Sequence, residues 1–188
     1  MNPTVLALAA AIIGFILGAA VIYLAKARQR SQELKSQFGH EYERMLSETG
    51  NRVRAESLLE ERRARVHRLS LRHLSAEERA SFEKGWNAVQ ARFVDDPSGA
   101  ITEADQLVNK VIHAVGYPDS DFEQQAGDIS VDHPESVEQY RAAHFIATRN
   151  QQDGVNTEQL RVALLHYKTI LGELLGGAAW TASGRNRI

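Results

Sequence analysis

The chain has 188 residues, no cysteine and a formal net charge of −2 at pH 7. The lack of cysteine excludes disulfides and thiolate zinc sites, and it fits a reducing compartment. The charge is unevenly distributed, because residues 26–79 carry 13 Lys/Arg and 9 Asp/Glu whereas residues 80–188 carry 9 and 15. The distal part therefore lacks the basic patch typical of a nucleic-acid-binding domain, and we expect no nucleic-acid partner.

Residues 5–24 contain no charged side chain, no amide side chain and no proline. A helix of that length spans about 30 Å, the thickness of the hydrocarbon core of a bilayer. We therefore predict a transmembrane anchor over residues 1–25. The run is longer than the apolar part of a cleavable signal peptide, and no basic side chain precedes it. Cleavage near residues 25–27, followed by export, stays an alternative.

Cations follow the predicted span at Lys26, Arg28, Arg30 and Lys35. The positive-inside rule then places the N-terminus outside and the rest of the chain in the cytoplasm. The predicted location is the inner (plasma) membrane, with a single pass. These cations also suit contact with anionic headgroups, although a simple stop-transfer flank explains them as well.

Small residues lie on one face of the span, at Ala10, Gly14 and Gly18. Such a face allows close helix–helix approach in lipid, so it would permit a homodimer through the transmembrane helix. Gly and Ala are also common in spans that do not associate.

Residues 26–70 are rich in charged helix formers and poor in apolar residues, which predicts a juxtamembrane helical stalk. Gly39 and Gly50-Asn51 are residue types at which helices end. The apolar positions are too sparse for a coiled coil, so we expect a mainly solvated stalk, with weak dimeric pairing as the alternative. The expected helices cover residues 26–38, 41–49 and 52–69.

Residues 71–175 contain the start and stop signals of a helical domain. Ser75 and Glu78 form a capping box, and Asp96 is followed by a proline at the first position of the next helix. Ser120 and Glu123, and Asn156 and Gln159, repeat the capping pattern. The expected principal helices cover residues 76–94, 97–115, 134–150 and 157–175, with a short helix over 120–127.

Four principal helices joined by short loops predict an antiparallel bundle. The fold class is therefore all-α, with an N-terminal transmembrane helix, a charged helical stalk and a four-helix-type bundle with one extra short helix. A loose tail is expected over residues 176–188. One end of the bundle should gather residue 75, the 116–133 segment and residue 175, and the stalk should attach there.

Several short motifs resemble a family of bacterial single-span membrane proteins. The resemblance covers the stalk and the distal domain. It implies the same architecture and a bacterial origin, and it implies no activity and no site. The motifs are AVQARFVDDP at 88–97, GYP at 116–118, DFEQ at 121–124, SVDHP at 130–134, YRAAH at 140–144 and HY at 166–167.

Acidic residues gather between Lys110 and Arg141, where the chain has no Lys or Arg. They suggest a divalent-cation site or a docking surface for a basic partner. The segment does not match the calcium-binding loop pattern, because Gln124 stands where Gly is needed and Ser130 where the bidentate Glu is needed. Capping of helix starts accounts for several of them. The residues predicted to bind a partner are Asp119, Asp121, Asp128, Asp132 and Glu135.

Histidine and tyrosine residues of the same domain suggest a polar network in its core. Paired-ligand patterns such as H-E-x-x-H do not occur, so we predict no metal site. Buried His and Tyr side chains usually find hydrogen-bond partners. The predicted network residues are His133, Tyr140, His144, His166 and Tyr167.

The chain has no G-x-S-x-G, P-loop or dinucleotide-binding motif, and we predict no catalytic residue and no cofactor. An anchor, a stalk and a bundle together favour a membrane-tethered helical interaction or scaffold module with an unknown protein partner. Two alternatives stay open. One is a helical domain that binds a small ligand or a metal and has an enzymatic role, and the other is a helical domain exported after signal cleavage.

Overall fold

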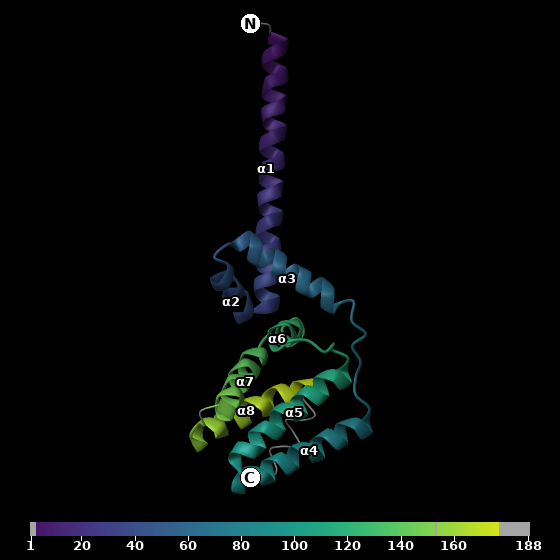
Figure 1. Ribbon diagram of the computed structural model, residues 1–188. Helices are drawn as coiled ribbons and strands as arrows, with labels where there is room; N and C mark the ends of the chain where they lie inside the picture. The colour runs from purple at the N-terminus through teal and green to yellow at the C-terminus, as the bar shows by residue number, and fades with distance from the viewer. Residues whose placement is uncertain (1–2, 153, 177–188) are drawn as a thin grey trace.

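A computed structural model describes the backbone of residues 3–152 and 154–176, with side-chain surroundings from residue 12 onward. These residues form eight helices and no strand, which confirms the all-α fold class. Figure 1 shows a long N-terminal helix, a small helical group at its far end, and a bundle beyond that group. Apart from Gly176, the predicted tail lies outside the described residues.

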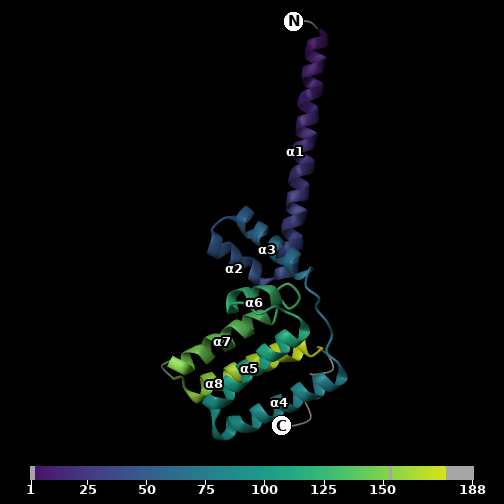
Figure 2. The same ribbon diagram turned by 45° about the vertical axis from the view of Figure 1, so that its right-hand side comes forward.

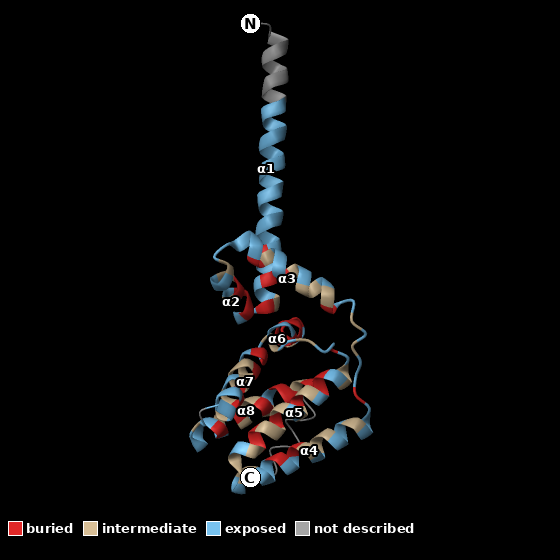
Figure 3. Cartoon of the chain, in the orientation of Figure 1, coloured by how far each residue is buried: buried red, intermediate tan, exposed pale blue. Residues whose placement is uncertain are grey.

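The first helix, α1 (Pro3–Phe38), has 36 residues and runs without a break from the apolar segment into the predicted stalk. At 1.5 Å per residue it is about 54 Å long. It is long and apolar enough to cross a membrane. Its described side chains from residue 12 to residue 30 are exposed within the chain, as a lipid-facing helix requires (Figure 3).

Two shorter helices fold back against the end of α1. They are α2 (His40–Thr49) and α3 (Arg52–Val66), and with residues 31–38 we call them the collar. Gly39 and Gly50 have φ values of 50° and 60°, a left-handed region that glycine enters at little cost. The predicted helix breaks at these two glycines are therefore confirmed.

More than half of the residues of the predicted stalk are exposed, but the sequence did not reveal that its apolar residues form a core. Its apolar residues are sparse along the sequence, but they come from three helices and converge on one another, so that together they form a small core continuous with that of the bundle. The convergence depends on the two chain reversals at Gly39 and Gly50, which the spacing of apolar residues does not reveal. The buried residues are Leu34, Phe38, Tyr42, Met45, Ala55, Leu59 and Val66.

The bundle contains α4 (Ala76–Asp95), α5 (Pro97–Val115), α7 (Val137–Gln152) and α8 (Thr157–Leu174), with the short α6 (Phe122–Ile129) between α5 and α7. Helices α5 and α8 are central, because α4 packs on α5 and α7 packs on both (Figures 1 and 2). The largest buried side chains are Trp86, Tyr140 and Tyr167. Apolar residues at helical spacing thus bury one face of each long helix.

Helix starts follow the capping signals with two corrections. The capping boxes of α4 and α8 are both present. The N-cap of α6 is Asp121, whose carboxylate accepts from the Gln124 N–H, rather than Ser120. Helix α7 starts at Val137 instead of residue 134, because the chain forms a turn after His133 first.

The two ends of the bundle gather the segments expected there. At one end, the Arg72 N–H donates to the Val115 carbonyl at 2.9 Å, which fixes the segment that links α3 to α4. At the other end, the Asn150 side chain donates to the Ser98 hydroxyl at 2.8 Å. The collar meets the bundle through α3 and α6, so the collar attaches at the first of these ends.

Candidate functional site

Glu41, near the start of α2, is the centre of an ion-pair network between the collar and the bundle. Its side chain is 1% exposed, and its Oε1 atom lies 2.8 Å from Arg62 Nη1 and 3.2 Å from Arg141 Nη2. Arg62 comes from α3 and Arg141 from α7, so one buried carboxylate joins three helices. A carboxylate in such a position is stabilised only while its cationic partners stay in place.

Glu123 of α6 extends this network. It accepts from Arg44 at 2.9 Å and from Arg141 at 2.5 Å. Partial burial opposes its ionisation, but the hydrogen bonds from the two arginines dominate and lower the pKa of the Glu123 carboxyl. We call the five residues that share these contacts the clasp: Glu41, Arg44, Arg62, Glu123 and Arg141.

A second buried ion pair lies beside the clasp. Asp128 of α6 is 1% exposed, and its Oδ1 atom accepts from Arg65 Nε at 3.0 Å. The neighbouring Gly127 leaves space for a guanidinium group, because a Cβ atom there would lie 2.8 Å from Arg62 Cζ. The basic α3 is thus held against the acidic α6 by complementary charge.

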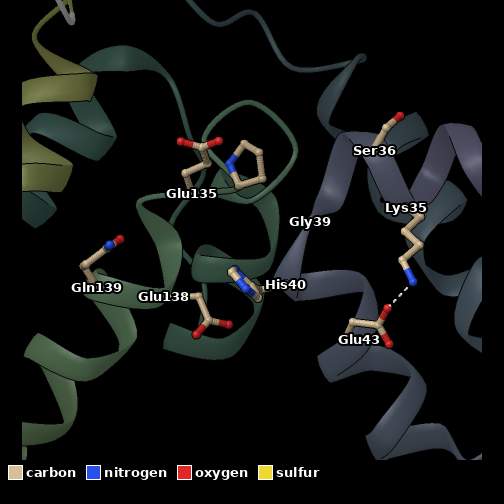
Figure 4. Close-up of a pocket in the computed structure, with 9 residues that line it drawn as sticks. Lys35, Ser36, Gly39, His40, Glu43, Glu135, Glu138 and Gln139 are labelled. Atoms are coloured by element: carbon tan, nitrogen blue, oxygen red, sulfur yellow. Dashed lines mark ion pairs between the residues drawn. The ribbon is translucent and has the colours of Figure 1, made fainter.

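A cleft of about 730 Å³ opens between the collar and the bundle. Figure 4 shows that one wall comes from the end of α1 and the start of α2, and the other from the α6–α7 turn and α7. The lining residues are Lys35, Ser36, Gly39, His40, Glu43, Pro134, Glu135, Glu138 and Gln139.

The cleft carries more negative than positive charge. The ammonium of Lys35 lies 2.6 Å from a Glu43 oxygen, so these two charges offset each other within one wall. Glu135 and Glu138, on the other wall, are exposed and form no ion pair within the described part of the chain. The cleft is therefore suited to a cationic group from outside the chain.

The five acids predicted to bind a partner fall into two groups. Three of them are engaged inside the chain: Asp121 caps α6, Asp128 is in the buried ion pair, and Asp132 accepts from a tyrosine hydroxyl at 3.2 Å. Asp128 is therefore not available for docking. Asp119 and Glu135 are exposed, and only Glu135 lines the cleft.

The polar network in the bundle forms around Asp105 of α5. Its Oδ1 atom accepts from the Tyr167 hydroxyl at 2.6 Å and lies 3.1 Å from His144 Nδ1. The Tyr140 hydroxyl donates to Gln125 Oε1 at 2.9 Å. The structure thus brings together three of the predicted network residues: Tyr140, His144 and Tyr167. Their hydrogen-bond partners, Asp105 and Gln125, were not part of the prediction.

Burial raises the pKa of the Tyr167 and Tyr140 hydroxyls, and the charge of Asp105 raises both further. Both groups therefore remain hydrogen-bond donors at neutral pH. The ring of Phe122 stacks on His144 at a centroid distance of 3.7 Å and an angle of 11°. Sequence reasoning did not include Asp105. Its spacing of four residues from Ile101 places it beside the apolar stripe of α5, and this spacing could have indicated that its side chain faces the core.

The two other predicted network residues lie apart from Asp105. The Nδ1 atom of His133 is 2.9 Å from Glu173 Oε2, so this histidine ties the α6–α7 turn to α8. His166 is half-buried, and this burial lowers its pKa. Among the residues that the structure describes, no group of three or more His, Asp or Glu side chains is arranged to hold a metal ion.

The small-residue face of α1 is open within the single chain. A Cβ atom added at Gly14 or Gly18 would meet nothing within 4 Å. The side chain of Ala10 lies outside the described residues. Self-association through this face stays a prediction.

A scan of protein-family models and searches of curated proteins and of solved structures found no match to this chain. The assignment of function therefore depends on the geometry of the chain itself.

Proposed function

We propose that this protein is a membrane-tethered helical interaction module, which presents the cleft between the collar and the bundle to a protein partner. One observation carries the proposal. Helix α1 continues from its apolar segment into the collar without a break, and the clasp ties the collar to the bundle. A continuous helix fixes the position of what it carries, whereas a flexible linker would not.

The proposed tether sets the height of the cleft. Lys35 and Ser36, which line it from α1, follow Leu24 by 11 and 12 residues. At 1.5 Å per residue, the α1 wall of the cleft lies roughly 16–18 Å beyond the end of the apolar segment. This height suits a partner that is itself at or in the membrane.

The charge of the cleft favours a partner that presents Lys or Arg side chains. Glu135 and Glu138 supply uncompensated negative charge on one wall, and Asp119 adds to it outside the cleft. Complementary charge raises the association rate and excludes partners of the wrong sign. The cationic flank of the span supports a cytoplasmic position for the bundle.

Site-specific photo-cross-linking in native membranes tests this function. A photoreactive residue at Gln139, in the cleft, should capture a partner that the same residue at Gln90, on the exposed face of α4, does not capture. Glu135→Lys with Glu138→Lys should abolish the capture because it reverses the charge of the wall. Equal yields at the two positions, or capture that survives the charge reversal, would contradict the proposal.

Orientation is tested separately, with Gln90→Cys as the single cysteine of the chain. A membrane-impermeant maleimide should label this position only after the cells are permeabilised. Labelling in intact cells would support the exported form instead.

A second candidate function is binding of a small ligand by the bundle, and one arrangement favours it. The Nδ1 atom of His144 is held by Asp105, which is how proteins orient an imidazole so that its other nitrogen can bind or transfer a proton. Thermal unfolding of the full chain in the presence of divalent metals tests this function. A stabilisation by several degrees that is lost in His144→Ala would support it, and no stabilisation by any metal would count against a metal site.

A further inference from the structure

Within α2, α3 and the turn that joins them, the turn lies nearest to the apolar segment of α1 (Figures 1 and 2). We define the tip as residues 50–54. Gly50 ends α2 in a left-handed conformation, and Asn51 caps α3 by accepting from the Arg54 N–H. The tip is therefore a well-formed turn between two helices, and not a loose loop.

The tip is linked to α1 just beyond the proposed span. The Nε atom of Arg52 donates to the Ser31 hydroxyl at 3.0 Å and to Glu56 at 2.9 Å. Ser31 follows Leu24 by seven residues, so the tip meets α1 about 10 Å beyond the apolar segment. The headgroup layer on each side of a bilayer is roughly 5–8 Å thick. The contact with Ser31 thus lies roughly 2–5 Å beyond the headgroup layer, so side chains of the tip are close to the headgroups.

The exposed side chains of the tip combine an apolar group with cations. Val53 is 78% exposed. Arg54 beside it is exposed, and no described acidic side chain pairs with it. Lys26 and Arg28 of α1 are also exposed and without an ion pair in the described part of the chain. An exposed apolar residue among cations is the pattern of segments that lie on anionic membrane surfaces.

We propose that the tip docks on anionic phospholipid headgroups of the leaflet from which α1 emerges, with Val53 entering the interface and Arg54 contacting lipid phosphates. This inference rests on the proposed function, because it requires that α1 spans the bilayer. Two attachment points, α1 and the tip, prevent rotation of the collar about the axis of α1. They therefore fix the direction in which the cleft faces.

The test uses the full chain with Val53→Cys, which carries an environment-sensitive fluorophore as the only cysteine. The chain is reconstituted in vesicles of phosphatidylcholine, alone or mixed with phosphatidylglycerol, that contain a lipid with a nitroxide on its headgroup. His67→Cys, at the other end of α3, is the matched control, because about 22 Å of helix separates it from the tip. We expect several-fold stronger quenching at position 53 than at position 67, and stronger quenching at position 53 in the anionic vesicles.

Arg54→Glu in the labelled chain should remove at least half of the quenching in anionic vesicles, and Arg54→Lys should keep most of it, because a cation near an anionic surface contributes about a fivefold preference. Equal quenching at positions 53 and 67, or no effect of Arg54→Glu, would overturn the inference. Flotation of the chain with both kinds of vesicle is measured in parallel. A chain that does not float overturns the proposed anchor, whereas a floating chain with equal quenching overturns only the docking of the tip.

Discussion

Glu41 contributes to stability through three guanidinium groups that surround it. Arg62 and Arg141 bind it directly, and Arg44 lies at 3.8 Å. Glu41→Gln keeps the shape of the side chain but leaves Arg62 without its counter-charge, and it removes one of the two carboxylates that pair with Arg141. Removal of one partner from a buried ion pair typically costs 3–5 kcal/mol. We therefore expect the free energy of unfolding of the full chain in detergent to fall by about 3 kcal/mol, as measured by urea titration.

The matched control is Glu33→Gln, on the exposed side of α1. Surface substitutions away from special features usually change stability by less than about 0.5 kcal/mol. If the two variants unfolded at the same urea concentration, the clasp would have no structural role.

Glu123 makes the same junction sensitive to acid. Its pKa in the folded chain is lowered by Arg44 and Arg141, against the effect of partial burial. A carboxyl with a depressed pKa stabilises the fold above its unfolded pKa, about 4.3 for Glu, and this stabilisation is lost as the pH falls through the folded value. We expect the urea concentration at which half of the natural chain is unfolded to decrease when the pH is lowered below about 4. Glu123→Gln should be less stable at pH 7 and should lose less on acidification, whereas parallel pH profiles for the two chains would contradict this assignment.

The core of the collar makes buried and exposed apolar residues of the same helical group unequal in their contribution to stability. Phe38, the last residue of α1, is fully buried, whereas Val53 near the start of α3 is 78% exposed. Truncation of a buried Phe to Ala costs about 3–5 kcal/mol, because it removes apolar burial and leaves a cavity. Phe38→Ala should therefore lower the unfolding free energy by about 3 kcal/mol, and Val53→Ala by less than about 0.5 kcal/mol. If both substitutions lowered the unfolding free energy by the same small amount in this titration, the buried residues of the collar would not form a stabilising core.

The helices themselves could be predicted because their ends depend on local chemistry. Each end signal acts on backbone groups within four residues, and each marks a helix end in the structure. The signals are Ser75 with Glu78, Asp96 before a proline, and Gly116. The collar core could not be predicted in this way. Leu34 and Leu59 are buried in one core although 25 residues separate them, and no periodicity connects positions on different helices.

The candidate site was predictable only in part, for the same reason. The acidic segment and the His–Tyr set were evident from composition, but their partners come from distant helices. Arg141 reaches Glu41 across 100 residues, and Tyr167 reaches Asp105 across 62. Without these pairs, the sequence did not distinguish Asp128, which is buried in an ion pair, from Glu135, which is exposed in the cleft.

The clasp joins the collar to the bundle and so determines how these two parts of the molecule are oriented relative to each other. One chain segment, residues 67–75, connects the collar to the bundle, and of the collar helices α3 makes the main helix–helix contact with it. Interfaces of this kind permit relative motion unless specific contacts prevent it. Arg141 is the bundle residue that binds both acidic members of the clasp, so it should restrict this motion most strongly.

Arg141→Met keeps the aliphatic part of the side chain and removes both ion pairs. We expect the helices to stay folded while the distance between the collar and the bundle becomes broadly distributed. Spin labels at Ser47→Cys on α2 and Thr148→Cys on α7, two exposed positions outside the clasp, should give a narrow distance distribution in the natural background and a wider one in the variant. A second pair within the bundle, at Gln90→Cys and Thr148→Cys, should be unchanged because the bundle does not depend on the clasp. A narrow distribution for the first pair in Arg141→Met would show that apolar packing alone orients the bundle, and the cleft would then keep its position without the clasp.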